Sequence, residues 1–298
     1  MCTALNFIIL YNDIQGYSQH YSQIQTLQFL QKLDEQYTKI ESIDENNNTT
    51  LNYFNDQNQN IMRVTLDNQK NIKESVEFYT DGALSKTSYK TNQTKTKKIF
   101  NKDKKLIKIA HTNQYNQSKT VDKTTITAWH EAGHAVSYIH LHPSYKIKHV
   151  TIEPNALHNS DGHVKYFMHS TDQTIEELEN HIISALCGGI AEQIVIGQNM
   201  LTDHHEILEY FAQSQFKSDI KAARQYAHEI IQKSISYTPA GQCNEKIDKI
   251  IVQLYKTAYQ FIYHHELQVK RIADQLLQKT TLHDYTPYDI IYAPRPTW

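Results

Sequence analysis

The hydrophobic and polar positions divide the chain into three zones with different rhythms. In residues 1–45 a short apolar run and a turn precede a stretch whose apolar residues recur every three positions, which predicts a strand, a turn and a helix. Residues 46–120 are rich in Asn, Gln, Lys and Thr, whereas residues 121–298 return to long apolar stretches at helical spacing. We therefore expect an α+β protein that is mainly α-helical, with a small strand-rich region before the helices.

The middle zone contains a loose internal repeat. Turn-prone pairs recur along it, and each is followed by an apolar position, which predicts an antiparallel meander of short strands. The alternative is a low-complexity linker, because polar tracts of this kind bury little apolar surface. The turn-prone pairs are Asn55-Asp56, Asp67-Asn68, Asp81-Gly82 and Lys102-Asp103.

Composition and charge narrow the class of protein. A chain of 298 residues is long enough for two or three modest domains. Its formal net charge of -2 argues against nucleic acid or an anionic membrane as partner. The three cysteines lie far apart and predict neither a disulfide framework nor a C-x-x-C metal site, which favours a reducing, cytoplasmic location. The apolar run near the N-terminus is too short to span a membrane, so we expect a soluble protein.

The third zone contains an H-E-x-x-H motif, formed by His130, Glu131 and His134. On an α-helix, residues four apart share a face, so both imidazoles can reach one metal ion. Zinc accepts such nitrogen ligands, and a catalytic site keeps one coordination position for water. The carboxylate of Glu131, next to the first ligand, is placed to act as a general base on that water.

A third protein ligand is expected downstream of the motif, and four candidates are present. They are Glu192 in an apolar helical run, His163 in a strand-like stretch, the polar cluster at 203–206, and Asp219. Asp219 is favoured, because it lies on the buried stripe of a predicted helix, where a lone carboxylate needs a partner. The alternative is that Asp219 caps its own helix. The stripe continues at Ala223, Tyr226, Ala227 and Ile230.

Four sequence blocks stand out in the third zone: H-E-A-G-H-A at 130–135, K-H-V-T-I-E-P at 148–154, C-G-G-I-A-E-Q-I-V-I-G at 187–197 and S-D-I-K-A-A at 218–223. In order and separation they resemble the protease domain of the FtsH-type ATP-dependent zinc proteases. The resemblance covers about 123–292 and implies an α-helical zinc metallopeptidase domain within residues 121–298. It implies Zn2+ as cofactor, with His130, His134 and Asp219 as ligands and Glu131 as base, while Glu192 would orient a ligand close to the metal.

The chain departs from this family in three respects. It has no G-x-x-x-x-G-K-[ST] phosphate loop among its 8 glycines and no membrane anchor. The stretch Gln215-Phe216-Lys217-Ser218 also replaces the family's small lead-in to the third ligand. We therefore expect an endopeptidase without its own ATPase, which cleaves unfolded or flexible proteins alone or with a separate unfoldase, and which can form oligomers as the family does. The alternative is a catalytically silent, zinc-stabilised protein-binding module, against which the intact Glu131 argues.

Overall fold

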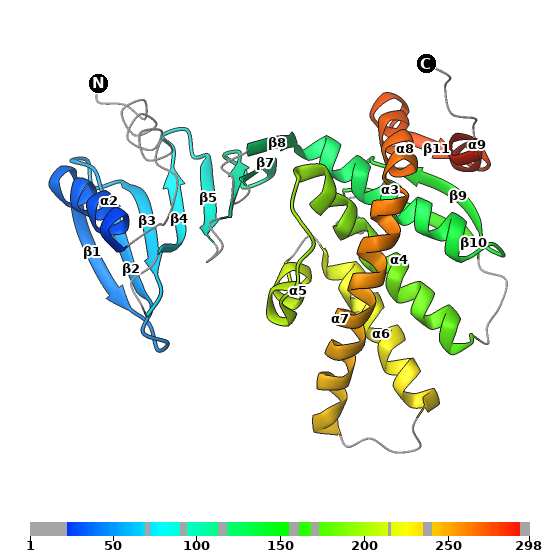
Figure 1. Ribbon diagram of the computed structural model, residues 1–298. Coiled ribbons are helices and arrows are strands. Elements are labelled where there is room, and N and C mark those ends of the chain that lie inside the picture. Colours follow the sequence, from blue (N-terminus) through cyan, green and yellow to red (C-terminus); the bar gives the residue numbers. More distant parts are fainter. Residues whose placement is uncertain are drawn as a thin grey trace. The chain divides into compact units, whose positions relative to one another are not determined.

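The computed structural model describes residues 23–68, 72–89, 94–112, 118–154, 161–167, 173–213, 216–234 and 240–292 (Figure 1). For residues 23–29 and 240–242 only the backbone is described. The chain divides into two compact units, Met1–Lys123 and Thr124–Trp298. The strand and turn expected near residues 7–16 lie outside the described residues.

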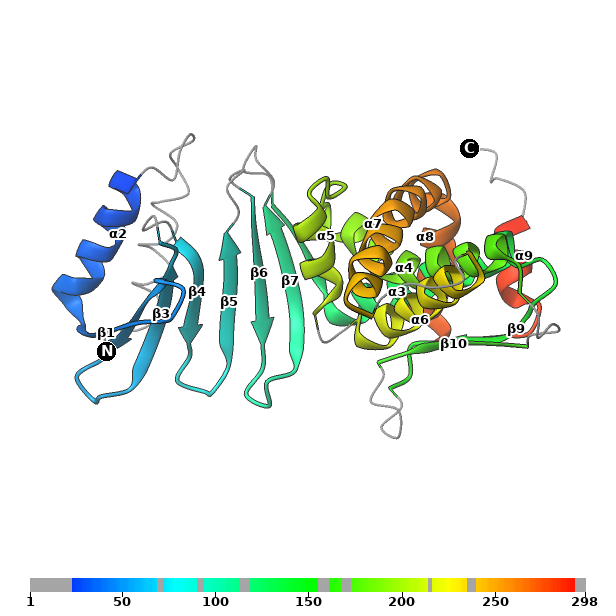
Figure 2. The same cartoon turned by 90° about the horizontal axis from the view of Figure 1, so that it is seen from below.

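The first unit is a helix packed on an antiparallel meander. Helix α2 spans Gln23–Gln36 and lies against the first strands of the sheet (Figures 1 and 2). Within the described residues, eight strands pair in chain order, each antiparallel to the next. Strand β1 falls inside the zone for which only a strand, a turn and a helix were expected, and the sequence pattern did not predict it. The strands are β1 Thr38–Ile43, β2 Thr49–Phe54, β3 Asn60–Leu66, β4 Ile72–Phe78, β5 Leu84–Tyr89, β6 Lys95–Phe100, β7 Leu106–Thr112 and β8 Ser118–Asp122.

A recurring five-residue turn accounts for three of the four turn-prone pairs seen in the sequence, and the turn after Asp67-Asn68 runs outside the described residues. In three of these turns an Asp or Asn side chain accepts hydrogen bonds from the backbone N–H groups two and four residues on, and this bonding favours the reversal. The fourth residue of each turn adopts a left-handed conformation, as in three-residue hairpin loops. The turns start at Asp44, Asn55, Tyr79 and Asn101, and the left-handed residues are Asn47, Asn58, Gly82 and Lys104.

The core of the first unit lies between α2 and strands β2 and β3. Strand β2 alternates between buried and half-buried positions, as expected for a strand with one covered face. From the helix, Leu33 packs into the same cluster. The buried members are Leu33, Leu51, Tyr53, Met62, Val64 and Leu66.

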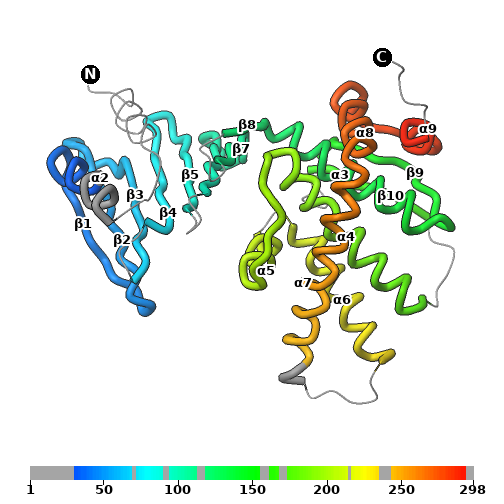
Figure 3. Tube along the Cα trace, viewed as in Figure 1, coloured from blue at the N-terminus to red at the C-terminus, as the bar shows by residue number. Residues whose placement is uncertain are grey.

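The second unit is a helical domain with a small three-stranded sheet, in the order β10-β9-β11. Helix α4 packs against α6 and α7, which also contact each other (Figure 3). None of the helices in the described part of the chain has both the length and the apolar character needed to cross a bilayer. The elements are α3 Lys123–Leu141, β9 Lys146–Thr151, β10 His163–Phe167, α4 Ile175–Ile196, α5 His204–Phe211, α6 Lys217–Ser234, α7 Ala240–His264, α8 Glu266–Lys279, β11 Thr281–His283 and α9 Thr286–Tyr292.

The expected fold class is confirmed: a mainly helical domain follows a strand-rich region. Helix α4 is longer than its apolar run, which begins at Ile182, because a capping box at Thr174 and Glu177 starts the helix about two turns earlier. Gly197 ends it in a left-handed conformation. The proposed division at residues 45 and 120 stays a prediction.

Candidate active site

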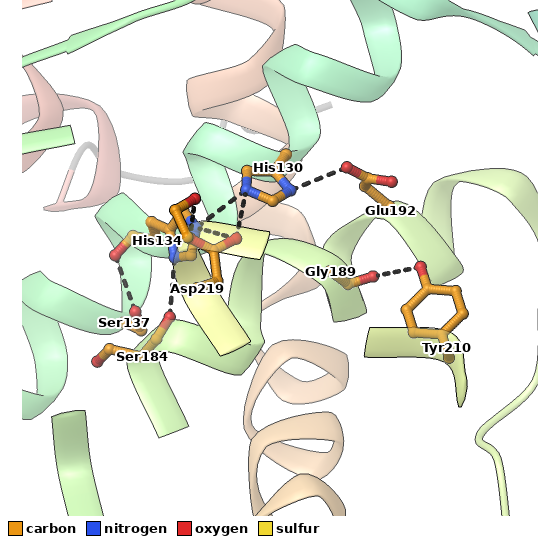
Figure 4. A network of polar contacts seen from close by, with 9 residues as sticks. His130, His134, Ser137, Ser184, Gly189, Glu192, Tyr210 and Asp219 are labelled. Carbon is orange, nitrogen blue, oxygen red and sulfur yellow. Dashed lines mark hydrogen bonds and ion pairs between the residues drawn. The ribbon is translucent and has the colours of Figure 1, made fainter. Parts of the chain in front are cut away.

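Helix α3 brings the two motif histidines together on its buried face. His130 and His134 are one turn apart, their Nε2 atoms are separated by 3.0 Å, and their ring centroids by 4.7 Å (Figure 4). This is the arrangement expected for residues four apart on one helix.

Both imidazoles are fixed through their other nitrogen. The Nδ1 atom of His130 lies 2.9 Å from Glu192 Oε1, and that of His134 lies 2.8 Å from the backbone oxygen of Ser184. A carboxylate and a carbonyl oxygen only accept hydrogen bonds, so each Nδ1 must carry the proton. With its proton on Nδ1, each ring can direct an Nε2 lone pair at a cation shared between the two rings.

Asp219, in the first turn of α6, completes the cluster. Its Oδ2 atom lies 3.2 Å from His130 Nε2 and 3.6 Å from His134 Nε2. This oxygen is buried and has no hydrogen-bond partner within the described part of the chain. Two imidazole nitrogens and a carboxylate oxygen thus converge within 4.8 Å of one another. A set of two nitrogens and one oxygen matches the protein ligands of catalytic zinc, so the residues present fit that ion.

The surroundings keep the Asp219 carboxylate charged despite its burial. Burial alone would raise the pKa of Asp219, but His134 and His130 more than offset that effect and hold the pKa below its usual value. For His130 burial lowers the pKa, whereas the carboxylates of Asp219 and Glu192 outweigh this and hold it well above the usual value. The lowered pKa of Asp219 and the raised pKa of His130 both indicate that a positive charge is stabilised between these groups.

Glu131 lies beside this cluster and is almost fully buried. Burial raises the pKa of its carboxyl to about 6, against the opposing effect of His130 and His134. No hydrogen bond restrains the carboxylate among the described residues, which leaves it able to take a proton. A group with a pKa near neutrality is suited to general base catalysis.

Glycines allow the backbone to approach the site closely. A Cβ atom added at Gly188 of α4 would lie 2.5 Å from His134 Nε2 and 2.8 Å from His130 Nε2, in the space between the two rings. A Cβ at Gly162, just before β10, would lie 2.9 Å from Glu131 Oε1. Side chains at these two positions would occupy the metal space or displace the base.

Two aromatic side chains lie next to the site, one against the His130 ring and one against the backbone of α4. Phe216 is fully buried and lies nearly parallel to the His130 ring, with a centroid distance of 6.1 Å. Tyr210 donates a hydrogen bond of 2.9 Å to the backbone oxygen of Gly189 (Figure 4). Neither role was predicted from the sequence. Phe216 belongs to the lead-in that departs from the family pattern, and its apolar character next to Asp219 was the available signal.

The other candidate ligands lie elsewhere. Glu192 contacts Nδ1 of His130, on the side of the ring away from the Nε2 cluster. His163 lies on β10, with its Nε2 2.9 Å from that of His149. In the polar cluster, Asp203 caps α5 by accepting from the backbone N–H of Glu206.

The chain is similar to known proteins over the part that contains this site. The model of peptidase family M41 matches residues 117–289. The chain is 28% identical over 191 residues to the ATP-dependent zinc metalloprotease FtsH of Mesomycoplasma conjunctivae, covering 56% of this chain and 24% of that protein. It is 27% identical over 180 residues to FtsH of Synechococcus sp., covering 53% and 28% of the two chains.

A mitochondrial relative is similar to the same degree. It is the inner membrane m-AAA protease component yta12 of Schizosaccharomyces pombe, 25% identical over 198 residues, which are 59% of this chain and 24% of the relative. The chain thus spans about a quarter of the length of these relatives. The family match covers more than half of the chain and includes the His130, His134 and Asp219 cluster. This chain belongs to peptidase family M41.

Proposed function

We propose that the chain is a zinc-dependent endopeptidase that hydrolyses peptide bonds in unfolded or flexible proteins. The observation that carries the proposal is the convergence of His130 Nε2, His134 Nε2 and Asp219 Oδ2, with the buried Glu131 carboxylate beside them. The names of the relatives, which are zinc metalloproteases, support the same activity.

The roles of the residues follow from their positions. His130, His134 and Asp219 would hold the zinc ion, which when bound activates a water molecule and polarises the scissile carbonyl. Glu131 takes the proton of the attacking water and returns it to the leaving amine. Glu192 and the backbone oxygen of Ser184 hold the two rings in the tautomer that binds metal.

Flexible segments are the proposed substrates, because the 298 residues contain no phosphate-loop motif for coupling ATP hydrolysis to unfolding. We propose that the substrate segment is either unstructured already or delivered by a separate unfoldase. A reducing, cytoplasmic compartment is part of the same proposal and is supported by the unpaired Cys187 and Cys243.

The test combines metal analysis with a peptidase assay on an unstructured protein such as casein. Wild type should contain one tightly bound zinc and cleave the substrate. Glu131→Gln should keep the zinc and lose at least 100-fold in turnover, within the range expected for a general base. Asp219→Ala should lower zinc affinity sharply. A wild-type protein that binds zinc and is stabilised by it, yet has no activity, would instead support the silent binding module.

A further inference from the structure

A second pair of histidines repeats the geometry of the pair on α3. His149 of β9 and His163 of β10 have their Nε2 atoms 2.9 Å apart, with ring centroids at 4.9 Å and an interplanar angle of 76°. For His130 and His134 the same quantities are 3.0 Å, 4.7 Å and 80°. Two imidazole nitrogens at this spacing can bind one ion.

A third histidine lies next to this pair. His283 of β11 is directly opposite His149 in the sheet register, and the two ring centroids are 6.1 Å apart. The residues Val150 and Leu282, which adjoin His149 and His283, are fully buried on the other face of the sheet. Because successive side chains on a strand point to opposite faces, the histidines project from the outer face. There His283 is exposed, and its side chain would have to rotate toward the pair to share an ion with it.

A hydrogen bond between two neutral imidazoles would also account for the His149–His163 distance, but it would not require a third histidine on the neighbouring strand. Three imidazoles without a carboxylate form a set that suits zinc, nickel and copper rather than magnesium or calcium. The exposed side chains of Lys148 and Lys165 lie on the neighbouring positions and lower the affinity for any cation. The ion would therefore bind more weakly here than at the buried cluster.

We propose that His149, His163 and His283 form a second, solvent-facing site for a divalent transition-metal ion of the zinc and nickel class. An ion at this site would join all three strands of the sheet. It would also act close to the base, because His163 directly follows Gly162, whose backbone packs against Glu131. Occupancy should therefore hold the start of β10 in place beside the active site.

The experiment is a zinc titration of the full chain by equilibrium dialysis, starting from metal-free protein. Wild type should bind two equivalents, one tight and one weak. The double variant His149→Gln/His163→Gln should keep the tight equivalent and bind the weak one at least tenfold less well. His130→Gln should lose the tight equivalent and keep the weak one. As a control, His264→Gln changes an exposed histidine on α7, whose Nδ1 bonds Gln260 O, and should leave both equivalents unchanged.

The tight equivalent reports whether the variants fold, so loss of the weak equivalent alone supports the second site. Should the double variant fail to fold, His283→Asn at the exposed position should weaken the same equivalent. Amide hydrogen exchange of β10 should slow when the weak equivalent binds. One equivalent in wild type, or a weak equivalent unaffected by His149→Gln/His163→Gln and His283→Asn, overturns the proposal. Absence of the tight equivalent would instead count against the proposed peptidase function.

Discussion

Because Nδ1 of each motif histidine carries a proton, the Nε2 atom of the same ring can donate its electron pair to a metal ion. Glu192 and the backbone oxygen of Ser184 accept hydrogen bonds from those N–H groups, so both Nε2 atoms of the pair are left as electron-pair donors. The role of Glu192 could be predicted from the sequence, because its side chain belongs to the block at 187–197 that resembles the family. The contact with the Ser184 backbone oxygen could not be predicted, because any residue at that position supplies the same carbonyl group.

At the residue scale, Gly188→Ala should remove zinc without unfolding the protein. An alanine in a helix interior is more stable than glycine by about 1 kcal/mol, so α4 itself gains from the change. The new Cβ, however, would lie 2.5 Å from His134 Nε2, in the space that a metal would occupy. Metal analysis should show a zinc content below a tenth of the wild-type value, with an unchanged far-ultraviolet circular dichroism spectrum.

Cys187→Ala is the matched control for that change. Cys187 is the preceding residue of the same helix and is fully buried. Burial raises the pKa of its thiol, so it is a protonated, inert side chain. Its truncation should cost stability but keep the zinc. Full zinc content in Gly188→Ala would show that the rings do not bind metal through their Nε2 atoms.

Among the elements, the helices and the strand-like stretch at His163 were predictable from local spacing, whereas the pairing of the small sheet was not. The buried stripe behind Asp219 is visible in the sequence, because Ala223, Ala227 and Ile230 recur at helical intervals and are buried on α6. Strands β9, β10 and β11 instead join positions up to 130 residues apart, such as Thr151 and Thr281, and no local pattern encodes such pairing. The contact of Gly162 with Glu131 was therefore unpredictable.

That contact gives a prediction for the start of β10. In Gly162→Ala the new Cβ would meet the backbone oxygen of Thr151 at 2.6 Å and the side chain of Glu131 at 2.9 Å. Because the backbone oxygen lies within a paired sheet, the strand or the base must shift. A displacement of about 1 Å can cost about 100-fold in rate, so turnover should fall by one to two orders of magnitude. Zinc content should stay at the wild-type level, and parallel loss of zinc and activity would contradict this account.

The end of α3 gives a prediction about pH. His142 is buried, stacks on His181 and bonds to the Ser184 hydroxyl. Burial, aided by His181, lowers the pKa of His142 to about 4, from an ordinary value of 6.5. The folded state thus keeps His142 neutral, and its contribution to stability is complete above pH 6.5. That contribution is lost as the pH falls from 6.5 to 4, because only the unfolded chain takes up the proton in this window.

His142→Gln retains a hydrogen-bonding group but does not titrate. Denaturant unfolding at pH 7 and at pH 4 should show that wild type loses more stability than the variant. The full pKa shift corresponds to an extra loss on the order of 3 kcal/mol. The comparison cancels other groups that titrate in both proteins, such as Glu177 near the same ring. Equal losses in wild type and variant would show that His142 titrates alike in the folded and unfolded chains.

On the scale of the whole molecule, the two units have separate cores and different sources of stability. The first unit depends on the apolar cluster around Met62 and Tyr53 and on repeated turns with local side-chain bonds. The second unit contains the metal-binding residues, where His130, His134 and Asp219 come from two helices. A bound ion links α3 to α6 in the native state only, so it stabilises that unit by mass action.

Two changes should therefore shift two different unfolding transitions in calorimetry. Removal of zinc with a chelator should destabilise the unit with residues 124–298, by about 4 kcal/mol if free zinc was a thousandfold above its dissociation constant. Met62→Ala removes a fully buried side chain from the core of the first unit and should cost that unit about 2–5 kcal/mol. At temperatures where both proteins are folded, the zinc content and peptidase activity of Met62→Ala should match the wild-type values. A single transition that both changes lower together would contradict the assignment of a separate core to each unit.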